Sequence, residues 1–195
     1  MSARSRGPRP ASLGFTLLEV MIVVIILGVV LALAIPNYIG AVNGSRLTST
    51  ANELLASLKQ ARAEAIRRNQ RVVVCPSVNG TSCSTNWSQG WLVFEDTNRD
   101  DAVSGGEEII AVATPAQGTQ VLPSAAISGT HRIRYSPDGF ARAANRALLN
   151  ARFAVCRPVA QPADNVRDVT LTSGSRTTIQ RRQASALCAT PANPT

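Results

Sequence analysis

Histidine, lysine and aromatic residues are scarce in this chain of 195 residues. It contains one histidine, His131, and one lysine, Lys59, and its aromatic content is 4%. It also lacks a Gly-rich phosphate loop and a nucleophile elbow. A lone histidine without a serine or cysteine motif beside it has no nucleophile to activate as a general base. The sequence therefore predicts a protein that is not an enzyme and uses no cofactor.

One long apolar stretch lies near the N-terminus and contains a single charge. Residues 15–35 read FTLLEVMIVVIILGVVLALAI, with Glu19 as the charged residue. A helix of this length spans about 30 Å, the thickness of the hydrocarbon core of a bilayer. Arg4, Arg6 and Arg9 precede the stretch, and residues 36–45 contain no arginine or lysine. This asymmetry places the leader in the cytoplasm and predicts that the rest of the chain is exported.

The residues at the start of the apolar stretch occur in a distinctive order. A basic leader ends in Gly14, Phe15 follows, and Glu19 stands inside the apolar stretch. This order resembles the class III leader of type IV pilins and of type II secretion pseudopilins. The resemblance implies that a prepilin peptidase cuts after Gly14 and methylates the amine of Phe15. It also implies that Glu19 pairs with the N-terminal amine of a neighbouring filament subunit, which offsets the cost of its burial. A plain transmembrane anchor is the alternative.

Beyond Pro36 the chain changes to a helical spacing of apolar residues and then to strand patterns. The amphipathic helix is expected to bury Leu47, Ala51, Leu54, Leu58, Ala61, Ala65 and Ile66. Strands are expected at residues 71–75, 90–95, 108–113, 131–136, 152–157, 167–172 and 177–180. The predicted fold class is α+β, with a long N-terminal helix, membrane-embedded in its first half, packed on an antiparallel β-sheet globular domain of type IV pilin-like form.

These patterns divide the chain into four segments. Residues 1–14 are the leader, and residues 15–36 are the transmembrane and filament-core helix. Residues 37–69 are the amphipathic second half of the helix. Residues 70–195 are a β-rich globular domain with a C-terminal tail tied by a disulfide.

All cysteines lie in the exported part of the chain, where an oxidising periplasm allows them to pair. Four cysteines permit three pairings. We expect Cys75 with Cys83, which closes the shortest loop, and Cys156 with Cys188, which fixes the C-terminal tail. Zinc is disfavoured because the chain has a single histidine and no C-x-x-C spacing.

The segment CPSVNGTSCSTNWSQGWLVFEDTNRD combines a strand that ends in cysteine, a small cysteine-closed loop and a G-W-x-x-F strand. It resembles the GspH, FimT and FimU group of minor pilins and pseudopilins, and RYSPDGFAR and DVTLTSGSR support the resemblance. Trp87, Trp91 and Phe94 are then expected in the core rather than on a ligand platform.

The resemblance implies a minor type IV pilin that assembles into or primes a pilus filament. Its partners are other pilins, the prepilin peptidase and the inner membrane, which it crosses once with its globular domain in the periplasm. A minor pseudopilin of type II secretion is the alternative, and a membrane-tethered periplasmic enzyme is disfavoured.

The acidic segment after residue 95 has the spacing of a calcium-binding loop. Positions 1, 3, 5, 7, 9 and 12 of an EF-hand-like loop are occupied by Asp96, Asn98, Asp100, Ala102, Ser104 and Glu107. Position 6, where the sharp turn favours glycine, is Asp101, and the flanking segments have strand patterns. A solvated acidic hairpin loop is therefore the preferred interpretation, with calcium at Asp96, Asn98, Asp100 and Glu107 as the alternative.

Four arginines lie between residues 167 and 182. Residues 173–178 of this segment resemble the Gly-Arg-x-Arg turn of DNA-binding FimT-like pilins, although Ser175 follows Gly174 here and the second arginine is absent. DNA contacted during uptake is therefore a candidate partner, and the alternative is a subunit contact or a solvated surface. The candidate DNA contacts are Arg167, Arg176, Arg181 and Arg182.

Overall fold

Helix α1 runs from Leu17 to Arg68 and begins at the apolar stretch. The structure, a computed structural model, describes residues 14 to 194, so the leader arginines lie outside the described residues. The chain divides into two units with their boundary between Tyr38 and Ile39, and α1 contributes to both. No helix among the described residues has the length and apolar character that crossing a membrane requires.

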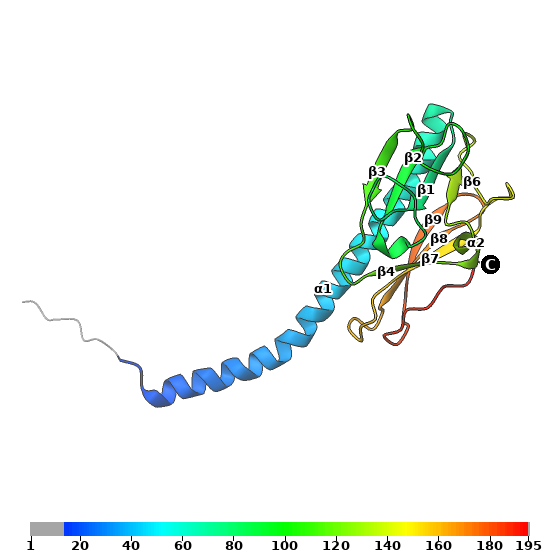
Figure 1. Cartoon of the computed structure of the whole chain (residues 1–195). Coiled ribbons are helices and arrows are strands. Elements are labelled where there is room, and N and C mark those ends of the chain that lie inside the picture. The colour runs from blue at the N-terminus through cyan, green and yellow to red at the C-terminus, as the bar shows by residue number, and fades with distance from the viewer. Residues whose placement is uncertain (1–13, 195) are drawn as a thin grey trace, which may run out of the picture. The chain divides into compact units, whose positions relative to one another are not determined.

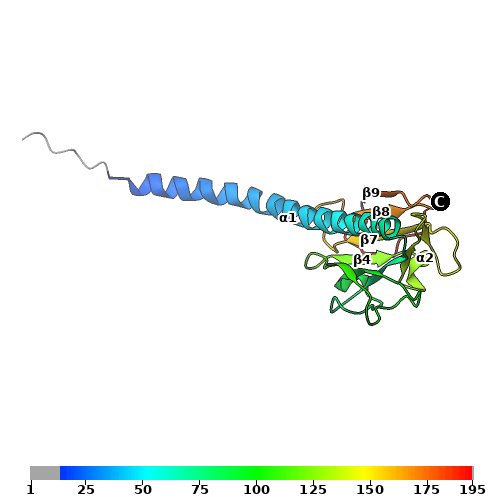
Figure 2. The ribbon, with the colours of Figure 1, turned by 90° about the horizontal axis from the view of Figure 1, so that it is seen from above.

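The strands of the second unit form two antiparallel sheets. In Figure 1 they lie beside the part of α1 that follows Ile39. The first sheet has the order β3-β2-β1-β5-β6, with β1 (Val72–Pro76), β2 (Trp91–Glu95), β3 (Ile109–Ala113), β5 (Ile133–Tyr135) and β6 (Ala141–Arg142). The second has the order β4-β7-β8-β9, with β4 (Gln120–Pro123), β7 (Ala151–Cys156), β8 (Val166–Leu171) and β9 (Thr177–Arg182). Figure 2 shows the second sheet in this order beside α1.

The α+β fold with a long helix on antiparallel strands is confirmed, but the sequence pattern missed four short elements. These are β4, β6, the 3-10 helix η1 (Trp87–Gln89) and helix α2 (Ala125–Ser128). Strand β5 also begins two residues later than predicted, because His131 has a φ of +53° and so cannot continue a strand. The missed elements have two to four residues, too few for a periodic pattern to identify them.

The apolar stripe of α1 forms the centre of the core. Six of the seven residues expected there have no exposed surface: Leu47, Ala51, Leu54, Leu58, Ala61 and Ala65. The prediction for Ile66 is wrong, because its side chain is 52% exposed. The buried residues alternate at steps of four and three, and Ile66, one position beyond Ala65, is rotated by about 100° from that face.

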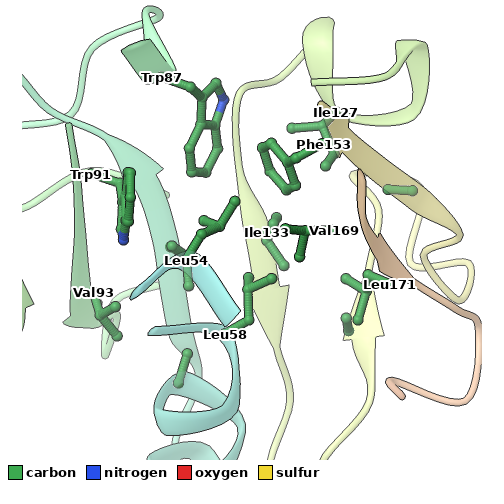
Figure 3. Packing of buried hydrophobic residues seen from close by; sticks show 14 of the residues in the cluster. Leu54, Leu58, Trp87, Trp91, Val93, Ile127, Ile133, Phe153, Val169 and Leu171 are labelled. Atoms are coloured by element: carbon green, nitrogen blue, oxygen red, sulfur yellow. The ribbon is translucent and has the colours of Figure 1, made fainter. Parts of the chain in front are cut away.

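The two sheets meet on α1 and share one hydrophobic cluster with it. Figure 3 shows Leu54 and Leu58 of the helix between Trp91 on one side and Val169 on the other. Trp91 is fully buried, and its indole N–H donates to Oγ of Ser57 on α1 at 2.9 Å. Trp87, Trp91 and Phe94 are all core residues, as predicted from the sequence.

Both disulfides join cysteines in the pairing expected from the sequence. Cys75 pairs with Cys83, and Cys156 with Cys188, each with a Cα–Cα distance of 5.7 Å. Ala154, Cys156 and Val166 form a small apolar cluster against which Cys188 packs. The second disulfide therefore fixes the C-terminal tail on β7 and β8.

We expect the folded, unreduced chain to contain no reactive thiol, because both pairs are closed. Thiol titration in denaturant should give zero equivalents before reduction and four after it, one for each cysteine. Non-reduced peptide mapping should link Cys75 to Cys83 and Cys156 to Cys188. Two free thiols in the unreduced sample, or any crossed peptide, would contradict this pairing.

Candidate functional site

The beginning of α1 presents an apolar surface that carries one carboxylate. The side chains of Leu17 to Ala32 are exposed throughout, and Phe15 before the helix is 82% exposed. Thr16 precedes the helix, and its hydroxyl accepts the backbone N–H of Glu19 at 3.2 Å. Glu19 thus stands in the first helical turn, where the helix dipole favours a negative charge. An exposed apolar surface of this length is typical of a segment that meets a membrane or partner helices.

Three of the four arginines proposed as DNA contacts form ion pairs with Asp164 or Asp168. Arg167 is 4% exposed, and its guanidinium lies 3.3 Å from Asp164. Arg181 lies 3.7 Å from the same carboxylate, and Arg182 lies 2.6 Å from Asp168. Burial lowers the pKa of Arg167, whereas the hydrogen bond with Asp168 raises the pKa of Arg182. The structure therefore does not gather these arginines into one accessible basic surface.

The turn between β8 and β9 is attached to the core by Ser175, a residue whose role the sequence did not reveal. Ser175 is 3% exposed and has a φ of +57°. Its hydroxyl accepts the backbone N–H of Ala141 at 2.6 Å, and its carbonyl accepts Nη1 of Arg62 at 3.2 Å. Arg176 follows Ser175 and is exposed. The segment that resembles a DNA-binding turn thus joins β6 and α1 to the second sheet.

The end of α1 is held to the first sheet by one arginine that contacts three carboxylates. Arg68 lies 2.7 Å from Glu64, 2.8 Å from Glu95 and 2.5 Å from Glu108. Hydrogen bonds from Arg67 and Arg68 lower the pKa of Glu64 to about 2. The sequence showed these charges but could not pair them, because Glu95 and Glu108 come 27 and 40 residues after Arg68.

The loop between β2 and β3 brings three of the four calcium candidates together. Carboxylate oxygens of Asp96, Asp100 and Glu107 all lie within 4.8 Å of one another. Asn98 donates to Asp100 at 2.8 Å and so lies beside the cluster. The spacing seen in the sequence therefore corresponds to a cluster of carboxylate oxygens in the structure.

Two families match this chain. The family described as type II transport protein GspH matches residues 50 to 175, and the prokaryotic N-terminal methylation motif matches residues 9 to 35. The second match covers Gly14, Phe15 and Glu19.

Two relatives and one solved structure are also similar. The pilin-like protein PilA1 of Thermus thermophilus is 39% identical over 95 residues, which are 49% of this chain and 55% of that protein. A fimbrial protein of Pseudomonas aeruginosa is 29% identical over 115 residues, which are 57% of this chain and 74% of that protein. The crystal structure of the type IV minor pilin FimU of Pseudomonas aeruginosa aligns with a TM-score of 0.53 at 16% identity, covering 72% of this chain and 96% of that one. At this identity FimU shows the fold alone.

Proposed function

Because the chain belongs to the GspH family and carries the N-terminal methylation motif, we propose that it is a minor type IV pilin that assembles into or primes a pilus. The family consists of structural, non-enzymatic pilins and pseudopilins. The observation that carries the proposal is the exposed apolar start of α1 with Glu19 in its first turn. The similarity to a pilin-like protein and a fimbrial protein favours a pilus. A minor pseudopilin of type II secretion is the second candidate, since the matching family is described as a type II transport protein.

The proposed sequence of events begins at the inner membrane. The leader, residues 1–14, is removed after Gly14 by a prepilin peptidase, and the amine of Phe15 is methylated. Residues 15–36 hold the subunit in the membrane with the globular domain in the periplasm. When the subunit joins a filament, the apolar residues leave lipid for neighbouring helices, which costs little because both surroundings are apolar.

Glu19 supplies the specific interaction in this assembly. A carboxylate in an apolar helix is costly without a partner, and removing one partner of a buried ion pair destabilises by about 3–5 kcal/mol. We propose that the N-terminal amine of a neighbouring pilin is that partner. Incorrectly aligned subunits would leave both charges unpaired, so the pair also selects the axial position of each subunit.

We expect Glu19→Ala to remain in the membrane but to be depleted from sheared pili by about tenfold or more, because the buried amine of its neighbour loses its partner. The measurement is an immunoblot of membrane and sheared fractions from a strain that lacks the native gene. Glu53→Ala is the matched control, since Glu53 is exposed on the same helix. Equal incorporation of Glu19→Ala and the control would remove Glu19 from the assembly mechanism.

The phenotype of the same deletion strain distinguishes a role in a type IV pilus from a role in type II secretion. If the strain loses surface pili but secretes proteins normally, the chain is a pilus subunit. If it has normal pili but impaired secretion, the chain is a pseudopilin of type II secretion.

DNA contact during uptake receives no support from the placement of the arginines, since Arg167 is buried and Arg182 is paired with Asp168.

A further inference from the structure

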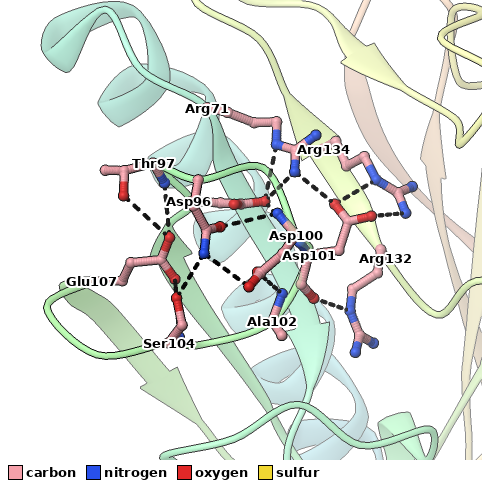
Figure 4. A network of polar contacts seen from close by, with 11 residues as sticks. Arg71, Asp96, Thr97, Asp100, Asp101, Ala102, Ser104, Glu107, Arg132 and Arg134 are labelled. Carbon is pink, nitrogen blue, oxygen red and sulfur yellow. Dashed lines mark hydrogen bonds and ion pairs between the residues drawn. The ribbon is translucent and has the colours of Figure 1, made fainter.

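The loop between β2 and β3 holds an arrangement of acidic groups that pilus assembly does not explain. Asp96 follows the last residue of β2, and Glu107 lies two residues before β3. Figure 4 shows these two residues with Asp100 and their polar contacts. We propose that this loop is a calcium-binding site that fastens the β2–β3 hairpin.

Asp96 is the first ligand, because one of its oxygens is buried without a partner. Its side chain has no exposed surface. Oδ2 accepts Nε of Arg71 at 2.9 Å and the backbone N–H of Asp101 at 3.2 Å, whereas Oδ1 has no hydrogen-bond donor within the described residues. A buried carboxylate oxygen without a partner is costly, and native proteins rarely leave one. Asp96 therefore retains one carboxylate oxygen with no partner among the described residues, with which it can coordinate an ion.

The spacing of the ligand atoms suits calcium. Calcium binds oxygens at about 2.3–2.6 Å, so two ligands on opposite sides of the ion are about 5 Å apart. The carboxylate oxygens of Asp96, Asp100 and Glu107 lie within 4.8 Å of one another and can contact one central ion. Asn98 lies beside these carboxylates, since its Nδ2 donates to Oδ2 of Asp100 at 2.8 Å and to Oγ of Ser104 at 3.0 Å. Carboxylate oxygens are ligands that calcium prefers.

The backbone supplies the turn for which the sequence offered no glycine. Asp101, at the sixth position of the loop, has a φ of +64°, and Arg99, at the fourth position, has a φ of +66°. Aspartate adopts this left-handed conformation more readily than most residues. The carboxylate of Asp101 points away to Arg134, whose Nε and Nη2 lie at 2.8 and 2.6 Å from it. The turn at the sixth position of the loop therefore forms without glycine.

The arginines Arg71 and Arg134 beside the loop pair with Asp96 and Asp101 rather than with Asp100 or Glu107. Arg134 is engaged by Asp101, and Arg71 is shared between Asp96 at 2.5 Å and Asp101 at 3.1 Å. The carboxylate of Glu107 accepts the backbone N–H groups of Thr97 at 2.9 Å and Ser104 at 3.0 Å, which fix its position in the loop.

Bound calcium would connect strands of the first sheet to one another through this loop. Arg71 immediately precedes β1, and it fixes Asp96 at the end of β2. An ion that ties Asp96 to Glu107 would extend this connection to β3. We therefore expect calcium to raise the resistance of the folded domain to heat.

The test uses the full chain in detergent micelles, stripped with EDTA and then given millimolar CaCl2 or MgCl2. Unfolding is followed by the fluorescence of the buried Trp87 and Trp91. We expect calcium to raise the unfolding midpoint by several degrees, because an ion bound only by the folded state stabilises it. Magnesium should give a much smaller shift, since it requires a tighter octahedral geometry than this loop offers. Calorimetric titration should give one calcium per chain.

Asp100→Asn and Glu107→Gln are the diagnostic variants, because they keep side-chain shape and leave the buried Asp96–Arg71 pair intact. Each should fold without calcium and lose most of the calcium shift. Glu53→Gln, an exposed acid remote in sequence from the loop, should keep the full shift. No calcium shift in the unaltered chain, an equal shift with magnesium, or a full shift in both loop variants would each overturn the proposal.

Discussion

Replacement of Gly14 by valine should leave the chain entirely as the uncut precursor, with no product that begins at Phe15. The resemblance to class III leaders implies that the peptidase accepts only a small residue before the scissile bond. A Cβ at Gly14 would meet no atom of the described residues within 4 Å, its two chain neighbours apart. We therefore attribute the expected loss of cleavage to recognition by the peptidase.

Intact-mass spectrometry of the membrane fraction measures this effect directly. The unaltered chain should have the mass of residues 15–195 plus one methyl group, and Gly14→Val should have the mass of the full chain. Gly28→Val is the matched control, because a Cβ at Gly28 also meets no described atom within 4 Å apart from the neighbouring residues and nearby backbone of its own helix. Mature, methylated Gly14→Val would refute the cleavage position, and failure of Gly28→Val to be cut would show that the change in Gly14→Val is not specific.

The second large effect is expected from Leu54→Ala, which should destabilise the globular domain by about 2–5 kcal/mol. Leu54 has no exposed surface and lies in the cluster shared by α1 and both sheets. Figure 3 shows it among residues that both sheets contribute. A cavity here removes contacts from three layers at once, and these layers cannot all move inward to fill it.

The measurement is urea unfolding of the full chain in detergent, followed by the fluorescence of Trp87 and Trp91. Leu55→Ala provides the same chemical change at the next position of α1, where the side chain is only partly buried. We expect this control to cost less than about 1.5 kcal/mol. Equal losses in the two variants would mean that the helix is not packed as described.

Local patterns predicted the elements of this fold well, because their causes are local. The stripe of α1 repeats at helical spacing, and the main strands lie within one or two residues of their expected positions. The sequence did not reveal that the strands form two sheets, since β4 pairs with β7 and β1 with β5 across many intervening residues. Pairing of this kind depends on packing around α1 and has no local signal.

The candidate sites were predicted less completely, for the same physical reason. Spacing alone identified the acidic loop, because its candidate ligands lie within twelve residues. Spacing could not reveal that Asp101 takes a left-handed conformation or that Arg71 holds Asp96. Likewise the cluster of arginines in the sequence gave no sign that Arg182 pairs with Asp168 across β8 and β9.

The outer strands of the two sheets determine how copies of this domain can and cannot associate. An unprotected outer strand is a template for uncontrolled strand addition and amyloid-like aggregation. Here β6 has two residues, β4 ends in Pro123, β3 is interrupted by a bulge opposite Val93 and Phe94, and β9 carries Arg181 and Arg182. Each of these features discourages a further strand from pairing. A domain whose outer strands are protected in this way can be held close to other copies without the sheets of different copies fusing into an irreversible aggregate.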